Sequence, residues 1–362
     1  MKNTFLAIFS LVITVVLHSC GNADDDVNFQ LNQGELGKGE LADDCLGFGD
    51  NDLLLSIQEQ FREPPGKVSI LFKVTDVSGN PVSGLTADQF RIFEQGRNDD
   101  CFNPISSSES FARISPNSQV FSNNTLLVLD LSNSVLEGSL EELKAASTSF
   151  INNVMPTPEN ESSKMAIYWF DGEDKLHLLN PLTSSIAELT AAVAAIDEDI
   201  SNDPSTDLYG AIIKSTDIAE NFIRTNIQSE TIGAASVVLF TDGTDQASRF
   251  TEERALNAVQ NANPNISFFT IGLGAEIDSE ILAEVGKTAS VVAANASELE
   301  TTFNQISAQV SEQANSFYLF EYCTPKRDGS GRNNLVIQLT NGALQGAVQT
   351  EFDATGFTGG CQ

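Results

Sequence analysis

Between residues 124 and 310, short apolar runs alternate with amphipathic stretches, and this alternation limits the fold more than any other feature. Five runs have the length and composition of strands, at residues 126–130, 165–170, 176–179, 236–241 and 267–271, and the first is apolar enough to be buried on both faces. Stretches with one apolar helical face lie between or after them, near residues 140–150, 186–196, 208–213, 252–262 and 299–310. The pattern predicts an α/β fold with a doubly wound, mainly parallel sheet and helices on both faces.

Oxygen-bearing side chains lie where these predicted strands end. Asp130, Ser132 and Ser134 follow the first strand at alternate positions. Thr206 comes just before the third helix, and Asp242 directly follows the fourth strand. Ligands bind at the carboxyl ends of strands in such sheets, and an all-oxygen set of carboxylates and hydroxyls suits a hard divalent cation. We therefore expect a metal site formed by three neighbouring loops.

The order Asp-x-Ser-x-Ser, then Thr, then Asp, in these strand contexts, resembles the metal ion-dependent adhesion site of the von Willebrand factor type A (VWA) domain. The resemblance covers about half of the chain and implies a Rossmann-like VWA fold. It also implies that Asp130, Ser132, Ser134, Thr206 and Asp242 hold Mg²⁺, or Mn²⁺ or Ca²⁺. In that family an open coordination position accepts a Glu or Asp carboxylate from a protein ligand. Asn133 stands where a Gly is common, and Asn tolerates the left-handed conformation.

Strand patterns also flank the α/β region. Residues 68–74 alternate in polarity and residues 91–94 form a second short run, an arrangement that resembles the β-sandwich segment preceding adhesion-type domains in secreted bacterial proteins. Residues 103–123, rich in Ser, Asn and Pro, are interpreted as a linker. Further strands are expected at residues 317–323, 335–339 and 348–352, the first two joined by a hairpin-like loop. We expect them to complete one discontinuous β-sandwich around the inserted α/β domain; three tandem units are the alternative.

The first residues have the pattern of an export signal. A basic start and a short apolar run end at Leu17-His18-Ser19-Cys20, which resembles a bacterial lipobox, with Cys20 as the lipidated residue. An ordinary signal peptide with a chance cysteine is the alternative. Asp24-Asp25-Asp26 resembles the surface-export signals of Bacteroidetes-type lipoproteins, or forms a plain spacer. We expect attachment to the bacterial envelope, at the outer membrane or cell surface, through this lipid alone.

The remaining cysteines fit an exported protein. Cys45, Cys101, Cys323 and Cys361 form an even set, which predicts two disulfides with three possible pairings. We favour Cys45–Cys101 and Cys323–Cys361, because each pair brackets one β-rich segment. The net charge of −31 without any basic stretch argues against nucleic acid as a partner.

These features divide the chain into five regions. They are a signal peptide (1–19), an acidic tether (20–65), a first β-sandwich segment with a linker (66–122), the VWA domain (123–312) and a C-terminal β segment (313–362). The expected function is binding of a protein partner through the cation, in adhesion or surface recognition; the alternative is an assembly factor of an envelope complex. A metal-dependent hydrolase has less support, and no enzymatic activity is expected. The one histidine after the signal, His177, is interpreted as a packed or surface strand residue, and no Gly-x-Ser-x-Gly elbow occurs.

Overall fold

A computed structural model describes residues 39–96, 98–106, 113–116, 121–228, 232–326 and 331–360. The predictions about the signal peptide, the lipidated Cys20 and the acidic run behind it lie outside these residues. None of the helices in the described ranges combines the length and the apolar character needed to cross a bilayer.

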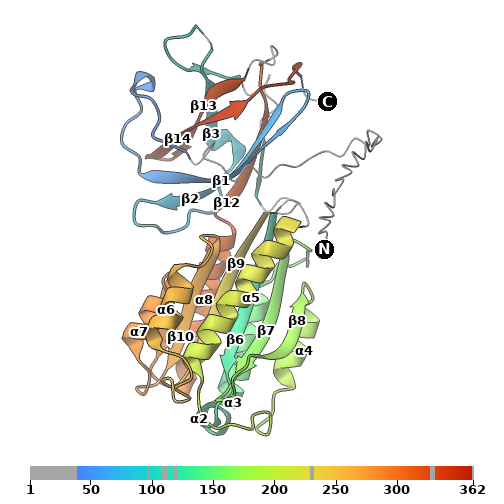
Figure 1. Cartoon of the computed structure of the whole chain (residues 1–362), viewed down its shortest axis with the longest axis vertical. Helices are drawn as coiled ribbons and strands as arrows, with labels where there is room; N and C mark the ends of the chain where they lie inside the picture. The colour runs from blue at the N-terminus through green and yellow to red at the C-terminus, as the bar shows by residue number, and fades with distance from the viewer. Residues whose placement is uncertain are drawn as a thin grey trace, which may run out of the picture. The chain divides into compact units, whose positions relative to one another are not determined.

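A six-stranded sheet forms the centre of the α/β domain, with strand order β11-β10-β9-β6-β7-β8 (Figure 1). Its strands are β6 (Phe121–Asp130), β7 (Ser163–Phe170), β8 (His177–Thr183), β9 (Ile232–Thr241), β10 (Ile266–Leu273) and β11 (Ala289–Ala293). Every neighbouring pair is parallel except β7 with β8. The predicted mainly parallel sheet is therefore confirmed, with one antiparallel edge strand.

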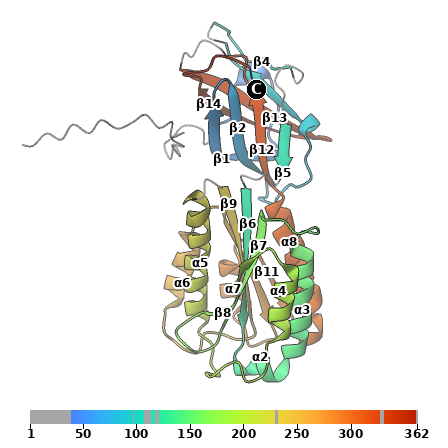
Figure 2. The same ribbon diagram turned by 90° about the vertical axis from the view of Figure 1, so that its right-hand side faces the viewer.

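Helices cover both faces of this sheet (Figure 2). They are α2 (Asn133–Gly138), α3 (Leu140–Val154), α4 (Ile186–Ala194), α5 (Leu208–Gln228), α6 (Glu252–Gln260), α7 (Ser279–Val285) and α8 (Leu299–Ala314). Consecutive β6 residues point to opposite faces, because side chains alternate along a strand. Leu127 and Leu129 pack in the core with α3, α4 and α8, while Leu126 and Val128 pack in the core with α5 and α6. Burial on both faces explains why this strand reads as a continuous apolar run.

Two antiparallel four-stranded sheets lie outside the α/β domain. One has the order β1-β2-β12-β5, with β1 (Leu53–Glu63), β2 (Lys67–Asp76), β12 (Phe317–Cys323) and β5 (Arg113–Pro116). The other has the order β14-β13-β3-β4, with β14 (Leu344–Asp353), β13 (Arg332–Asn341), β3 (Phe90–Glu94) and β4 (Asn103–Pro104). Short 3-10 helices occupy Asp44–Leu46, Ala87–Gln89 and Ala296–Glu298. Ile70 and Phe72 of one sheet share a hydrophobic core with Leu335 and Ile337 of the other.

Strands from before and after the α/β sheet share both antiparallel sheets. β2 pairs with β12, and β3 pairs with β13. The chain therefore leaves this β structure after β5, forms the six-stranded sheet and returns through β12, which itself pairs with β5. This connectivity supports the proposal of one discontinuous β-sandwich with an inserted α/β domain.

Three sequence interpretations were wrong. The predicted tether at residues 20–65 contains β1, whose alternate residues Leu53, Leu55 and Ile57 are buried. The predicted linker at residues 103–123 contains β4, β5 and the start of β6, which pair with neighbouring strands. β12 and β13 do not form a hairpin, because they belong to different sheets. α7 and the edge strand β11 were not predicted.

One disulfide has both of its cysteines among the described residues. Cys45 and Cys101 are bonded, with their Cα atoms 5.8 Å apart, which confirms the favoured pairing for these two residues. Cys323 is also in a disulfide. Because Cys361 lies outside the described residues, the Cys323–Cys361 pair stays a prediction.

Candidate metal centre

The candidate site lies at the carboxyl ends of β6 and β9, which are parallel neighbours in the sheet. Asp130 is the last residue of β6, and Asp242 directly follows β9. The register pairs Leu129 with Phe240, so both strands end at the same level. The parallel pairing thus brings together two carboxylates that are far apart in the sequence.

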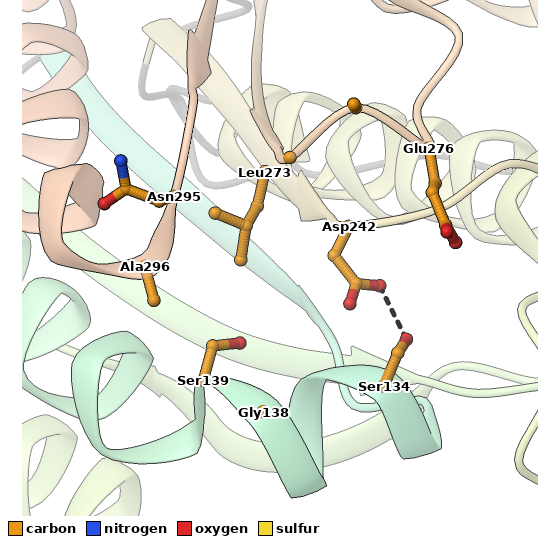
Figure 3. Close-up of a pocket in the computed structure, with 10 residues that line it drawn as sticks. Ser134, Gly138, Ser139, Asp242, Leu273, Glu276, Asn295 and Ala296 are labelled. Atoms are coloured by element: carbon orange, nitrogen blue, oxygen red, sulfur yellow. Dashed lines mark hydrogen bonds between the residues drawn. The ribbon is translucent and has the colours of Figure 1, made fainter.

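Hydrogen bonds connect four of the five predicted ligands. The Ser132 amide donates to Asp130 Oδ1 at 2.9 Å, which turns the chain from β6 toward α2. The hydroxyl oxygens of Ser132 and Ser134 lie 3.3 Å apart. Ser134 Oγ in turn donates to Asp242 Oδ1 at 2.9 Å (Figure 3). The residues form one continuous set of oxygen atoms from the interior to the surface, since Asp130 and Ser132 are buried and Ser134 is exposed.

Thr206 is held against the loop that follows Asp242. Its carbonyl oxygen accepts hydrogen bonds from the amides of Gln246 at 2.8 Å and Ala247 at 3.1 Å. Its hydroxyl oxygen would lie 3.8 Å from a Cβ built on Gly243. The Asn133 amide also donates to the Pro204 carbonyl oxygen at 3.3 Å. These contacts fasten the Thr206 loop to both of the other loops.

Thr241 is a further site residue, which the sequence analysis did not identify. Its hydroxyl donates a 2.6 Å hydrogen bond to Asp130 Oδ2, and both side chains are completely buried. Thr241 is the last residue of β9, and β9 pairs with β6. The hydrogen bond to Asp130 therefore depends on the pairing of these two strands. Only the position of Thr241 directly before the Asp-Gly pair could have indicated a role.

The electrostatic environment is unfavourable for the carboxylates alone. Burial raises the pKa of Asp130 to about 7; the Asp242 charge adds to this, while the Thr241 hydrogen bond opposes it. Burial also raises the pKa of Asp242, and Glu276 adds to that shift. Among the described residues, no Lys or Arg side chain is a main cause of either shift in pKa. Two adjacent carboxylates without a cationic neighbour, surrounded by hydroxyl oxygens, fit a divalent cation.

A cavity of about 290 Å³ opens beside Asp242. Figure 3 shows Asp242 and Glu276 on one side of it, and Leu273, Asn295 and Ala296 farther along. Ser134 also lines this cavity, so the exposed end of the oxygen set is accessible from it. The oxygen set therefore ends at the wall of this cavity.

Comparison with known proteins agrees with this architecture. Residues 125–244 match the family model described as von Willebrand factor type A domain. No curated protein sequence matches the chain.

Three solved structures are among those to which the chain is similar. A von Willebrand factor type A protein from Catenulispora acidiphila is 10% identical, with 83% of this chain and 73% of that chain covered and a TM-score of 0.44. The manganese-loaded TRAP protein of Plasmodium vivax is 13% identical, with 68% and 98% covered and a TM-score of 0.44. The vWF domain of the type V pili tip protein Mfa5 from Porphyromonas gingivalis is 14% identical, with 53% and 96% covered and a TM-score of 0.39.

Proposed function

We propose, from the von Willebrand factor type A domain that this chain contains, that it binds a protein partner through a divalent cation. Asp130, Ser132, Ser134, Thr206 and Asp242 would hold the ion, with Mg²⁺ as the expected metal and Mn²⁺ or Ca²⁺ as substitutes. When bound, the ion supplies an open coordination position to a carboxylate of the partner. The supporting observation is the buried Asp130 at the inner end of a hydrogen-bonded set of oxygen atoms.

The position of the cavity supports binding of a side chain from a partner. Ser134 and Asp242 belong both to the oxygen set and to the cavity wall. A Glu or Asp side chain of the partner would enter there and approach the ion. Glu276 borders the same cavity and disfavours a second acidic group. We therefore expect a single docking carboxylate on an otherwise neutral or basic surface.

The net charge of −31 also disfavours a partner with an acidic surface. It repels acidic surfaces, although salt at physiological concentration limits that repulsion to about 8 Å. The local attraction between the ion and one carboxylate is short-ranged and survives this screening. With Cys20 as a lipid anchor, the chain would present this site at the bacterial envelope, in adhesion or surface recognition.

A pull-down from native membranes tests the proposal. The bait is the wild-type chain or Asp242→Ala, in buffer with Mg²⁺ or with EDTA. We expect the wild type to capture a specific protein in Mg²⁺ only, and Asp242→Ala to capture none. Asp217→Ala is the matched control, because Asp217 is exposed on α5 and its replacement removes the same charge. Equal capture by the wild type in Mg²⁺ and in EDTA would contradict the proposal.

A further inference from the structure

A second group of potential ligands lies at the turn between β7 and β8. Asp171 directly follows β7, Glu173 lies in the turn and His177 is the first residue of β8. One donor atom from each side chain lies within 4.8 Å of the other two. None of these residues belongs to the oxygen set at Asp130, and the group includes a nitrogen donor.

The distances match the spacing of ligands around one ion. His177 Nε2 lies 3.6 Å from Asp171 Oδ1 and 3.3 Å from Glu173 Oε2. Ligand atoms at about 2.0–2.1 Å from a tetrahedral Zn²⁺ are roughly 3.4 Å apart. His177 Nε2 is buried and has no hydrogen-bond partner of acceptable geometry among the described residues. The imidazole nitrogen therefore faces two carboxylates at the separation of co-ligands.

The surrounding contacts hold two of these side chains in place. The His177 ring stacks on Trp169, with ring centroids 3.8 Å apart and an interplanar angle of 10°. Asp171 is completely buried; its Oδ1 accepts from the Glu173 amide at 2.9 Å and its Oδ2 from Ser201 Oγ at 2.7 Å. Such outer contacts orient metal ligands in established sites.

Lys175 competes for one of the ligand atoms. Its Nζ lies 2.7 Å from Glu173 Oε2, and its side chain is 58% exposed. A half-exposed lysine gains little from such a pair and can turn into solvent. A bound dication would replace it as the counter-charge for Glu173.

We propose that Asp171, Glu173 and His177 form a second cation site, selective for a transition-metal dication such as Zn²⁺. One imidazole with two carboxylates is a donor set that Zn²⁺ and its neighbours Co²⁺ and Ni²⁺ accept, whereas Mg²⁺ strongly prefers oxygen ligands. The three protein ligands leave a fourth position for water. The site is therefore distinct from the oxygen site in both location and metal preference.

Trp169 provides a direct signal for this site, because it is the only tryptophan in the chain and stacks on His177. The experiment titrates the full chain with Co²⁺ in excess Mg²⁺ and follows tryptophan fluorescence. We expect Co²⁺ to quench the emission, Zn²⁺ to restore it by displacement, and Mg²⁺ alone to leave it unchanged.

Variants at two of the proposed ligands test metal binding, and the first of them leaves the ring stack intact. Glu173→Gln keeps the Trp169–His177 stack. It should raise the Co²⁺ concentration needed for half-maximal quenching about tenfold or more. His177→Gln should abolish it. Glu142→Gln, an exposed replacement on α3 with the same charge change, should match the wild type. Absence of quenching in the wild type, or equal quenching in Glu173→Gln and Glu142→Gln, would overturn the proposal.

Discussion

Asp130 is the residue on which the candidate metal site most depends. Its carboxylate is completely buried, and Asp242 is near enough for its charge to raise the Asp130 pKa further. Without a cation, an ionised Asp130 is therefore destabilising, because a buried charge lacks compensation. A bound dication would remove that penalty, which links the stability of the protein to metal and to pH.

The pH dependence of stability without metal follows from the raised pKa of Asp130. Because its pKa of about 7 exceeds that of the unfolded chain, the folded state retains the proton as pH rises and its relative stability declines. In EDTA, the wild type should lose about 2 kcal/mol more unfolding free energy between pH 5 and 7 than Asp130→Asn does. Urea denaturation at both pH values measures this difference. Equal losses in the two proteins would contradict the assignment.

Thr241 should affect metal affinity without being a predicted ligand. Valine has nearly the same shape as threonine, so Thr241→Val removes the 2.6 Å hydrogen bond to Asp130, together with the longer hydrogen bonds of the hydroxyl to the Gly243 amide at 3.2 Å and carbonyl oxygen at 3.3 Å. We expect the Mg²⁺-dependent rise in Tm to begin at about tenfold higher Mg²⁺, the usual cost of losing such a contact. Thr241→Ser keeps the hydroxyl and is the control. A Val variant that responds to Mg²⁺ as the Ser variant does would argue against this role.

At the scale of single residues, the sequence was informative where a local pattern carries the chemistry. Asp130, Ser132 and Ser134 are separated by one residue each, and their spacing alone predicts that they lie together. Thr241 could not be assigned, because its hydrogen bond to Asp130 joins two strands that are 111 residues apart in the chain. The Asp171 group was missed for a related reason: His177 reaches it through the antiparallel pairing of β8 with β7.

Among the elements, β1 and β14 approach each other closely at Gly346. β14 belongs to one antiparallel sheet and β1 to the other. A Cβ on Gly346 would overlap the backbone carbonyl oxygen of Leu53, which cannot move without displacing β1. The absence of a side chain at this position therefore sets how closely these two strands pack.

Gly346→Ala should destabilise the protein by about 1–3 kcal/mol, because a backbone clash in a packed region forces strands apart. Urea denaturation followed by circular dichroism measures the change. Gly138→Ala is the control, since a Cβ there meets no atom within 4 Å, and surface changes stay within about 0.5 kcal/mol. The packing argument fails if the two variants have the same unfolding free energy.

The strength of the periodic signal decided which elements could be predicted. Strand β10 and the ends of β6 and β9 were located closely, but β6 and β9 begin before their predicted starts at residues 126 and 236, and α5 continues to Gln228, beyond the predicted 208–213. β5 is only four residues long and lies in a Ser- and Pro-rich stretch, and β11 is an edge strand. β1 has a clear alternation at Leu53, Leu55 and Ile57, but its polar continuation resembles the acidic segment before it.

For the whole molecule, the chain connectivity defines which edge of the six-stranded sheet is free for the candidate site. β5 and β12 are paired neighbours in one sheet, and the six-stranded sheet is inserted between them in the sequence. The candidate metal site lies at the carboxyl ends of β6 and β9, whereas the chain enters β6 at its amino end. A parallel strand separates these ends by its full length, so the connections leave the site edge clear.

Calorimetric titration of the full chain with Mg²⁺ tests the central claim most directly, because Mg²⁺ prefers the oxygen site and needs no partner. The wild type should bind one Mg²⁺ per chain. Asp130→Asn, verified as folded by circular dichroism, should release no heat of binding. A wild type that binds no Mg²⁺, or an Asp130→Asn variant that binds it with unchanged Kd, would contradict the account.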